Sequence, residues 1–187
     1  DKLLQQAEAA AAAENWDKFK EILNKIVNTN LDLELLEKYI WDYLTSIGAE
    51  SDPDKEFHVR GGMEYVGLEL EKGKIVVDGD AGDRYGFKMK GGKLVIKGNA
   101  GNHVGDRMSD GEIVINGNIA HGFGEMVGGK ATVKGNVTGT KTAHDMSGGT
   151  LIIEGDVKED IGDYMHGGEI TVKGNARLVG NHFMDGG

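Results

Sequence analysis

A repeat of 18 to 20 residues occupies the sequence from Gly73 onward. Each copy has one short apolar run, then Gly followed by Asp or Asn, and ends on Met-x-x-Gly. A period this short, with one strand-like run per copy, is typical of stacked coils. A weaker seventh copy precedes the others, from Phe57 to Leu70. We therefore predict a mainly β fold, a right-handed parallel β-helix of about seven coils. The six clear copies span residues 73–91, 92–110, 111–128, 129–148, 149–167 and 168–186.

Each copy begins with a triplet such as Ile113-Val114-Ile115. Side chains alternate between the faces of a strand, so we expect the first and third residues of each triplet to face the interior. A methionine near the end of every copy indicates another inward column. A row of methionines can bind a soft metal, but Met also fills irregular gaps in apolar cores, and we predict core packing. The column comprises Met89, Met108, Met126, Met146, Met165 and Met184.

The Gly-Asp or Gly-Asn pair after each triplet predicts the first corner of a coil, because both residue types tolerate left-handed backbone. Stacked Asn and Asp side chains can pass hydrogen bonds from coil to coil. Calcium binding would need paired carboxylates, and the two aspartates of this column are far apart, so we predict a structural ladder. The predicted turn and ladder residues are Gly79, Asp80, Gly82, Gly86, Gly98, Asn99, Gly101, Gly105, Gly117, Asn118, Gly135, Asn136, Gly155, Asp156, Gly174 and Asn175.

The N-terminal segment, residues 1–52, has no glycine before Gly48 and is rich in Ala, Leu, Glu and Lys. Apolar residues at helical spacing predict α-helices in it. An open β-helix end exposes unpaired strand groups and core, so we predict that this segment is an α-helical cap on the first coil. Recruitment of a partner is the alternative. The β-helix itself is assigned to residues 53–187.

The composition excludes several classes of function. A net charge of −10 argues against nucleic acid and anionic membranes as partners, since phosphate binding relies on concentrated Lys and Arg. No apolar stretch is long enough to cross a bilayer. The sequence has no cysteine, which excludes disulfides, thiolate ligands and cysteine-held iron–sulfur clusters. A reducing compartment is compatible with this composition, and we expect a cytoplasmic protein.

No catalytic, cofactor-binding or metal-binding residue is predicted. The glycines follow strands and recur in every coil, which indicates corners rather than a phosphate cradle. The serines are in no Gly-x-Ser-x-Gly sequence. Carboxylates such as Asp106, Glu125 and Asp163 are expected on the solvated outer face. The histidines, which differ in their offset from the corner glycine and are therefore not expected to converge on a metal, are His58, His103, His121, His144, His166 and His182.

The spacing Gly79-x-x-Gly82-x-x-x-Gly86, the Gly-Asp or Gly-Asn pairs and the Met-x-x-Gly endings resemble the Gly-x-Gly-x-Gly β-helix superfamily. That superfamily includes the β-helix subunit of formylmethanofuran dehydrogenase and the C-terminal domain of the glutamate synthase large subunit. The resemblance covers residues 57–187. It implies a β-helix without catalytic residues that positions partner subunits, which carry molybdopterin or tungstopterin, or flavin and iron–sulfur clusters.

We therefore expect a non-catalytic scaffold subunit of a multi-subunit redox enzyme, closest to the β-helix subunit of formylmethanofuran dehydrogenase. A stand-alone glutamate synthase β-helix domain is the first alternative. An alternative of another class is a small-molecule binder or enzyme that uses a groove beside the coils. Every earlier Met-x-x-Gly leads into another strand, so we expect the edge after Met184 to be paired by further chain, by another subunit or by self-association.

Overall fold

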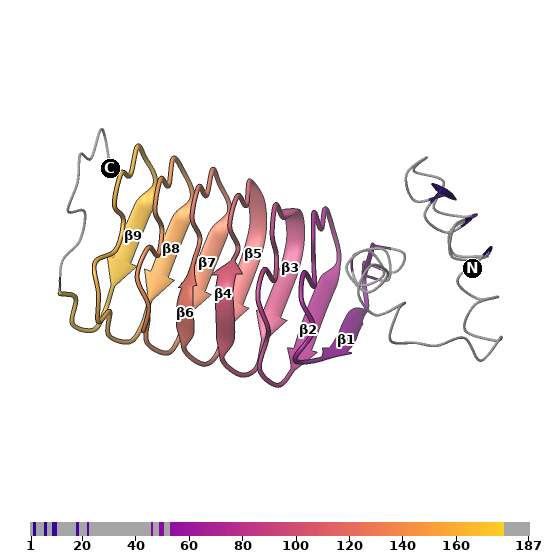
Figure 1. Cartoon of the computed structure of the whole chain (residues 1–187), viewed down its shortest axis with the longest axis horizontal. Helices are drawn as coiled ribbons and strands as arrows, with labels where there is room; N and C mark the ends of the chain where they lie inside the picture. The colour runs from indigo at the N-terminus through magenta and orange to yellow at the C-terminus, as the bar shows by residue number, and fades with distance from the viewer. Residues whose placement is uncertain are drawn as a thin grey trace. The chain divides into compact units, whose positions relative to one another are not determined.

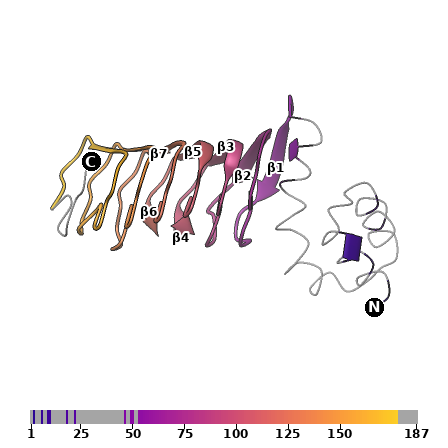
Figure 2. The same ribbon diagram turned by 90° about the horizontal axis from the view of Figure 1, so that it is seen from above.

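A computed structural model of the chain describes residues 53–177 and, before them, Lys2, Gln6, Ala9, Ala10, Lys18, Ile22, Ser46, Ala49 and Glu50. From residue 53 the described chain is mainly β and forms a parallel β-solenoid of about six turns (Figures 1 and 2). The strands of its longer sheet, in spatial and chain order, are β1 (Glu56–Arg60), β2 (Lys74–Asp78), β3 (Lys90–Ile96), β5 (Asp110–Ile115), β7 (Lys130–Val133), β8 (Thr150–Ile153) and β9 (Glu169–Val172).

The register of the long sheet places the same repeat position of every coil in one column. Ile75 pairs with Leu94, and Leu94 pairs with Ile113. A shorter parallel sheet joins β4 (Ala100–Val104) to β6 (Ile119–Gly122) after the first corner. Single bridges continue that second face through the later coils. The parallel stacking agrees with the sequence prediction. The weak first copy of the repeat also forms a strand of the sheet, β1, as predicted.

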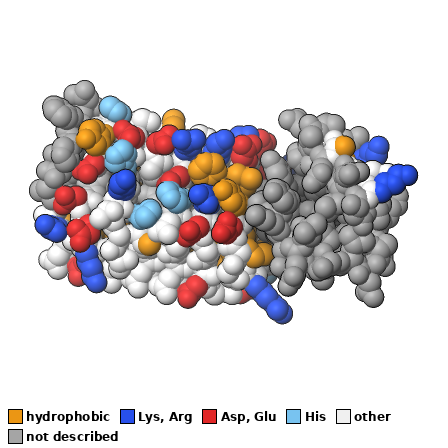
Figure 3. All heavy atoms as spheres, in the orientation of Figure 1, with side chains coloured by type: hydrophobic (Ala, Val, Ile, Leu, Met, Phe, Trp, Pro, Cys, Tyr) orange, Lys and Arg blue, Asp and Glu red, His pale blue; other side chains and the backbone are white. Residues whose placement is uncertain are grey.

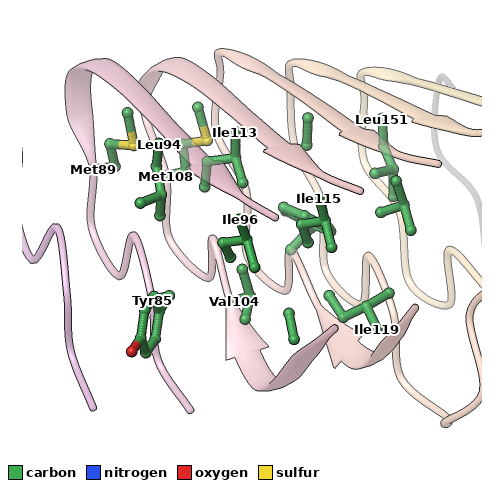
Figure 4. Packing of buried hydrophobic residues seen from close by; sticks show 14 of the residues in the cluster. Tyr85, Met89, Leu94, Ile96, Val104, Met108, Ile113, Ile115, Ile119 and Leu151 are labelled. Carbon is green, nitrogen blue, oxygen red and sulfur yellow. The ribbon is translucent and has the colours of Figure 1, made fainter. Parts of the chain in front are cut away.

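The interior is apolar and continuous along the stack (Figure 4). The first and third triplet residues are buried in β2, β3, β5, β7 and β8, as predicted. Val76 departs from the prediction, because this middle residue is also buried. In β9, the last strand of the described sheet, Ile170 and Val172 are only half-buried. The column after the first corner is buried from Ala100 to Val157, and its last described member, Ala176, is exposed.

The methionine column lies in the core, which confirms the packing prediction for its described members. Met184 lies outside the described residues. Leu70 occupies the equivalent position in the first coil and is fully buried. The buried methionines, each no more than 2% exposed, are Met89, Met108, Met126, Met146 and Met165.

Two aromatic side chains that the repeat did not single out, Tyr85 and Phe123, are the largest fully buried ones of the described chain. Tyr85 lies in the same column as Val104, because the carbonyl of Tyr85 accepts a hydrogen bond from Gly105 N. Phe123 lies in the column of Gly105, where a Cβ on the glycine would meet ring carbon Cδ1 at 2.5 Å. The ring therefore fills the space that Gly105 leaves empty.

The chain divides into two compact units, Asp1–Ile40 and Trp41–Gly187. Most of the predicted helical cap lies outside the described residues. Within the second unit, Ala49 is fully buried in the solenoid core. The hydroxyl of Ser46 donates to the carbonyl of Leu68 at 2.9 Å, and the carboxylate of Glu50 accepts from Glu71 N at 2.9 Å. These three residues thus contact the first coil.

Candidate functional site

The Asp and Asn side chains of the first corner form a row that runs from coil to coil. Oδ1 of each residue accepts a hydrogen bond from the backbone N–H of the next residue in the row. The five bonds lie between 2.7 and 2.9 Å and run from Asp80 through Asn99, Asn118, Asn136 and Asp156 to Asn175. The bonds join a side chain to a backbone; at the last step Nδ2 of Asn175 also donates to Asp156, at 3.1 Å.

The glycine before each ladder residue after Asp80 is required by close approach, whereas a Cβ on Gly79 would meet no atom within 4 Å. A Cβ on Gly98 would lie 2.1 Å from Oδ1 of Asp80, and one on Gly155 would lie 2.5 Å from Oδ1 of Asn136. Only Gly79 among these glycines has positive φ, at 125°. The expectation of left-handed backbone is therefore wrong for the later members of the row, which are Gly98, Gly117, Gly135, Gly155 and Gly174.

Left-handed backbone recurs instead at the second corner and at the Met-x-x-Gly turns of the described coils, for example at Arg84, His103 and Gly92. Two columns of the second corner show it in every described coil. The first column includes Gly86 and Gly105, with φ of 66° and 67°, and continues through non-glycine residues such as Phe123. The second column, two residues later, has φ between 51° and 58° in every coil. Its members, which lie directly before the buried Met or Leu, are Glu69, Lys88, Arg107, Glu125, Asp145 and Tyr164. A row of polar and charged residues therefore lies along the second corner, one in each coil.

The backbone at the first corner has its donors engaged already. Gly98 N donates to the carbonyl of Gly79, and Asn99 N donates to the Asp80 side chain. A phosphate cradle needs free N–H groups, so this geometry favours the structural interpretation of the glycines. Among the buried residues that the structure describes, the polar side-chain groups are the hydroxyls of Ser46, Tyr85 and Thr142.

Two histidines of adjacent coils meet at the second corner, a ring contact that the sequence prediction, which concerned only convergence on a metal, did not include. The rings of His103 and His121 are 5.2 Å apart between centroids and pack edge to face. The two histidines differ in their offset from the corner glycine, and a register shift of β4 and β6 between Asn102 and Val104 brings them together nonetheless. Asp106 is more than a loose outer carboxylate: Oδ2 contacts Nδ1 of His103 at 2.8 Å, and Oδ1 accepts from a backbone N–H at 2.8 Å.

A second group of histidines surrounds Asp145. Nδ1 of His144 lies 2.6 Å from Oδ2 of Asp145, and Nε2 of His166 lies 3.9 Å from Oδ1. The rings of His144 and Tyr164 are 5.2 Å apart. Within the part of the chain that the structure describes, no three His, Asp or Glu side chains are arranged to hold a metal ion. The histidines of this group are instead found in pairs with a carboxylate.

His58 lies on β1, away from the other described histidines. Its ring contacts Asp78 at 2.9 Å and Glu56 at 3.3 Å. Hydrogen bonds from Lys97 and His58 hold the pKa of Asp78 below its ordinary value. The remaining histidine of the sequence prediction, His182, lies outside the described residues.

The second corner of the first coils also carries five residues that we call the aromatic–cation patch: Tyr65, Arg84, Phe87, Lys88 and Arg107. The two rings pack edge to face with centroids 6.3 Å apart. Arg84 lies 5.2 Å from the centroid of Tyr65, whereas Lys88 and Arg107 lie 5.6 and 6.0 Å from that of Phe87. Figure 3 shows hydrophobic, basic, acidic and histidine side chains interspersed over one face of the solenoid.

No protein-family model matches the chain, and the search of curated proteins finds no relative. Within the described residues, no helix is both long and apolar enough to cross a membrane.

Proposed function

We propose that the protein is a non-catalytic scaffold subunit of a multi-subunit redox enzyme, of the kind represented by the β-helix subunit of formylmethanofuran dehydrogenase. The ladder from Asp80 to Asn175 is the observation that carries this proposal. It uses the polar groups of the first corner to join each coil to the next. In this view molybdopterin or tungstopterin belongs to partner subunits, and the solenoid, wound right-handed, sets their spacing in the cytoplasm.

Ion pairs between adjacent coils support the same role. Lys97 contacts Asp78 at 2.5 Å, and Lys173 contacts Glu154 at 3.2 Å, in each case across one step of the sheet. Exposed pairs of this kind add little stability individually, because solvent and salt screen their attraction. Each pair joins one coil to the next, as a spacer between subunits requires.

We also propose that the N-terminal helical segment caps the first coil. The burial of Ala49 and the hydrogen bonds made by Ser46 and Glu50 support this assignment. Deletion of residues 1–52 should expose the apolar end of the solenoid and cause aggregation or loss of cooperative melting. A soluble 53–187 fragment with unchanged melting behaviour would refute the cap.

The scaffold proposal is tested by isolating the protein from its source under native conditions. Size-exclusion chromatography with light scattering gives the mass of the assembly, and mass spectrometry identifies the other subunits. We expect a complex in which molybdenum or tungsten and iron accompany the larger subunits and are absent from the separated chain. Partners with glutaminase and flavin-binding activity would favour the glutamate synthase alternative. A monomer that catalyses a reaction unaided would overturn the scaffold assignment.

A further inference from the structure

We propose that the aromatic–cation patch is a docking surface for an acidic segment of a partner protein. The patch consists of Tyr65, Arg84, Phe87, Lys88 and Arg107, which the second corners of three successive coils bring together. This inference rests on the scaffold proposal and deepens it, because it assigns a place and a chemistry to the contact with a partner.

Three carboxylates around the patch are already engaged. Glu69 binds Lys90 at 3.0 Å, and Asp106 binds His103 at 2.8 Å. Glu125 binds Arg107 through two hydrogen bonds of 3.0 and 3.1 Å.

Arg84 and Lys88 differ from these paired groups. Neither has a carboxylate partner within ion-pair distance among the described residues, and Lys88 is exposed. On a chain with a net charge of −10, two such neighbouring cations form a local site for an anionic ligand.

The rings orient these cations. Attraction to an aromatic ring holds Arg84 over Tyr65 and Lys88 over Phe87, which restricts both side chains before any ligand arrives. A carboxylate can then add to the outer side of each cation through charge-assisted hydrogen bonds without displacing the ring.

The same arrangement disfavours single-stranded nucleic acid. Bases bind such surfaces by stacking on aromatic faces, and here a cation occupies a face of each ring. A protein segment that carries two or more Asp or Glu side chains satisfies both cations and needs no free ring face.

The test measures binding of a fluorescein-labelled octaglutamate peptide to the full chain by fluorescence anisotropy, at low and at high salt. The charge-reversed double variant Arg84→Glu, Lys88→Glu is compared with Lys134→Glu, which changes an exposed lysine after β7. A charge-preserving double variant, Arg84→Lys with Lys88→Arg, separates loss of charge from disturbed folding. Circular dichroism melting checks that every variant is folded.

We expect the charge-reversed double variant to weaken peptide binding at least tenfold. That tenfold loss corresponds to about 1.4 kcal/mol of binding free energy. The affinities of Lys134→Glu and of the charge-preserving variant should stay within about threefold of that of the unchanged protein. Equal loss in Lys134→Glu, no loss in the charge-reversed variant, or tighter binding of labelled oligothymidylate than of octaglutamate would each overturn the inference. Because the assay needs no native partner, its failure would leave the scaffold proposal to be judged by the composition of the isolated complex.

Discussion

Replacement of Gly105 by alanine should strongly destabilise the solenoid. Gly105 has φ of 67°, and its added Cβ would lie 2.5 and 2.6 Å from Cδ1 and Cε1 of the buried Phe123 ring. Left-handed backbone costs a non-glycine residue about 1–2 kcal/mol, and overpacking of a core costs about 1–3 kcal/mol. We therefore expect the free energy of unfolding to fall by about 2–5 kcal/mol.

Gly124 provides a matched control in the next coil. Its φ is not positive, and the nearest atom to an added Cβ, Oδ1 of Asp106, is at 3.4 Å, an ordinary contact. Gly124→Ala should change the free energy of unfolding by no more than about 1 kcal/mol, and can raise it by restricting the unfolded chain. Equilibrium urea unfolding followed by far-ultraviolet circular dichroism measures both variants.

A double variant identifies the cause of the Gly105→Ala effect. Phe123→Leu removes the ring atoms that the new methyl group would contact. If the clash dominates, the combined loss should be smaller than the sum of the two single losses by about 1–2 kcal/mol. Strictly additive losses, or equal losses for the alanines at positions 105 and 124, would refute the reasoning.

Four further predictions concern the core and the ladder. Met108→Asp should lower the melting temperature severely, because it buries an unpaired charge; an unchanged melting temperature would contradict core packing. Thr142→Val should raise the free energy of unfolding by about 1 kcal/mol in urea titrations, since the buried hydroxyl has no hydrogen-bond partner in the part of the chain that the structure describes; a loss would show an unrecognised bond. Asn118→Ala should cost about 1 kcal/mol and Asn116→Ala, outside the ladder, about half or less; equal losses would discount the ladder. Burial raises the pKa of the Tyr85 phenol above its ordinary value of 10.0, so the stability that the neutral phenol contributes is present below pH 10 and is lost as the pH rises further. Tyr85→Phe should reduce the fall in melting temperature between pH 8 and 11, and an identical pH profile in the variant would disprove this role of Tyr85.

The repeat alone was sufficient to predict the stacked strands and their inward side. Ile113 and Ile115 are buried, and Met108 joins them in the core (Figure 4). The prediction succeeds because each coil must bond to its neighbour in register. A residue that is apolar at the same repeat position in every coil therefore faces the same interior.

The corner contacts could be predicted only in part. The row of Asp and Asn side chains was visible as a pattern, but the reason for its glycines was not. Gly98 is needed because the Asp80 carboxylate lies against it, and that contact exists only after two coils are stacked. The pairing of His103 with His121 was missed for a related reason: a register shift between β4 and β6 aligns positions whose sequence offsets differ.

The aromatic–cation patch shows the same dependence on tertiary structure. Tyr65, Phe87 and Arg107 are more than 40 positions apart from first to last, and no local pattern joins them. By itself, the sequence determined the repeat, the strand direction and the apolar columns, because these follow from periodicity and side-chain alternation. Only the tertiary structure decided which outer side chains meet. The corners shift the register by single residues and turn through left-handed backbone, and either change moves a side chain from one neighbour to another.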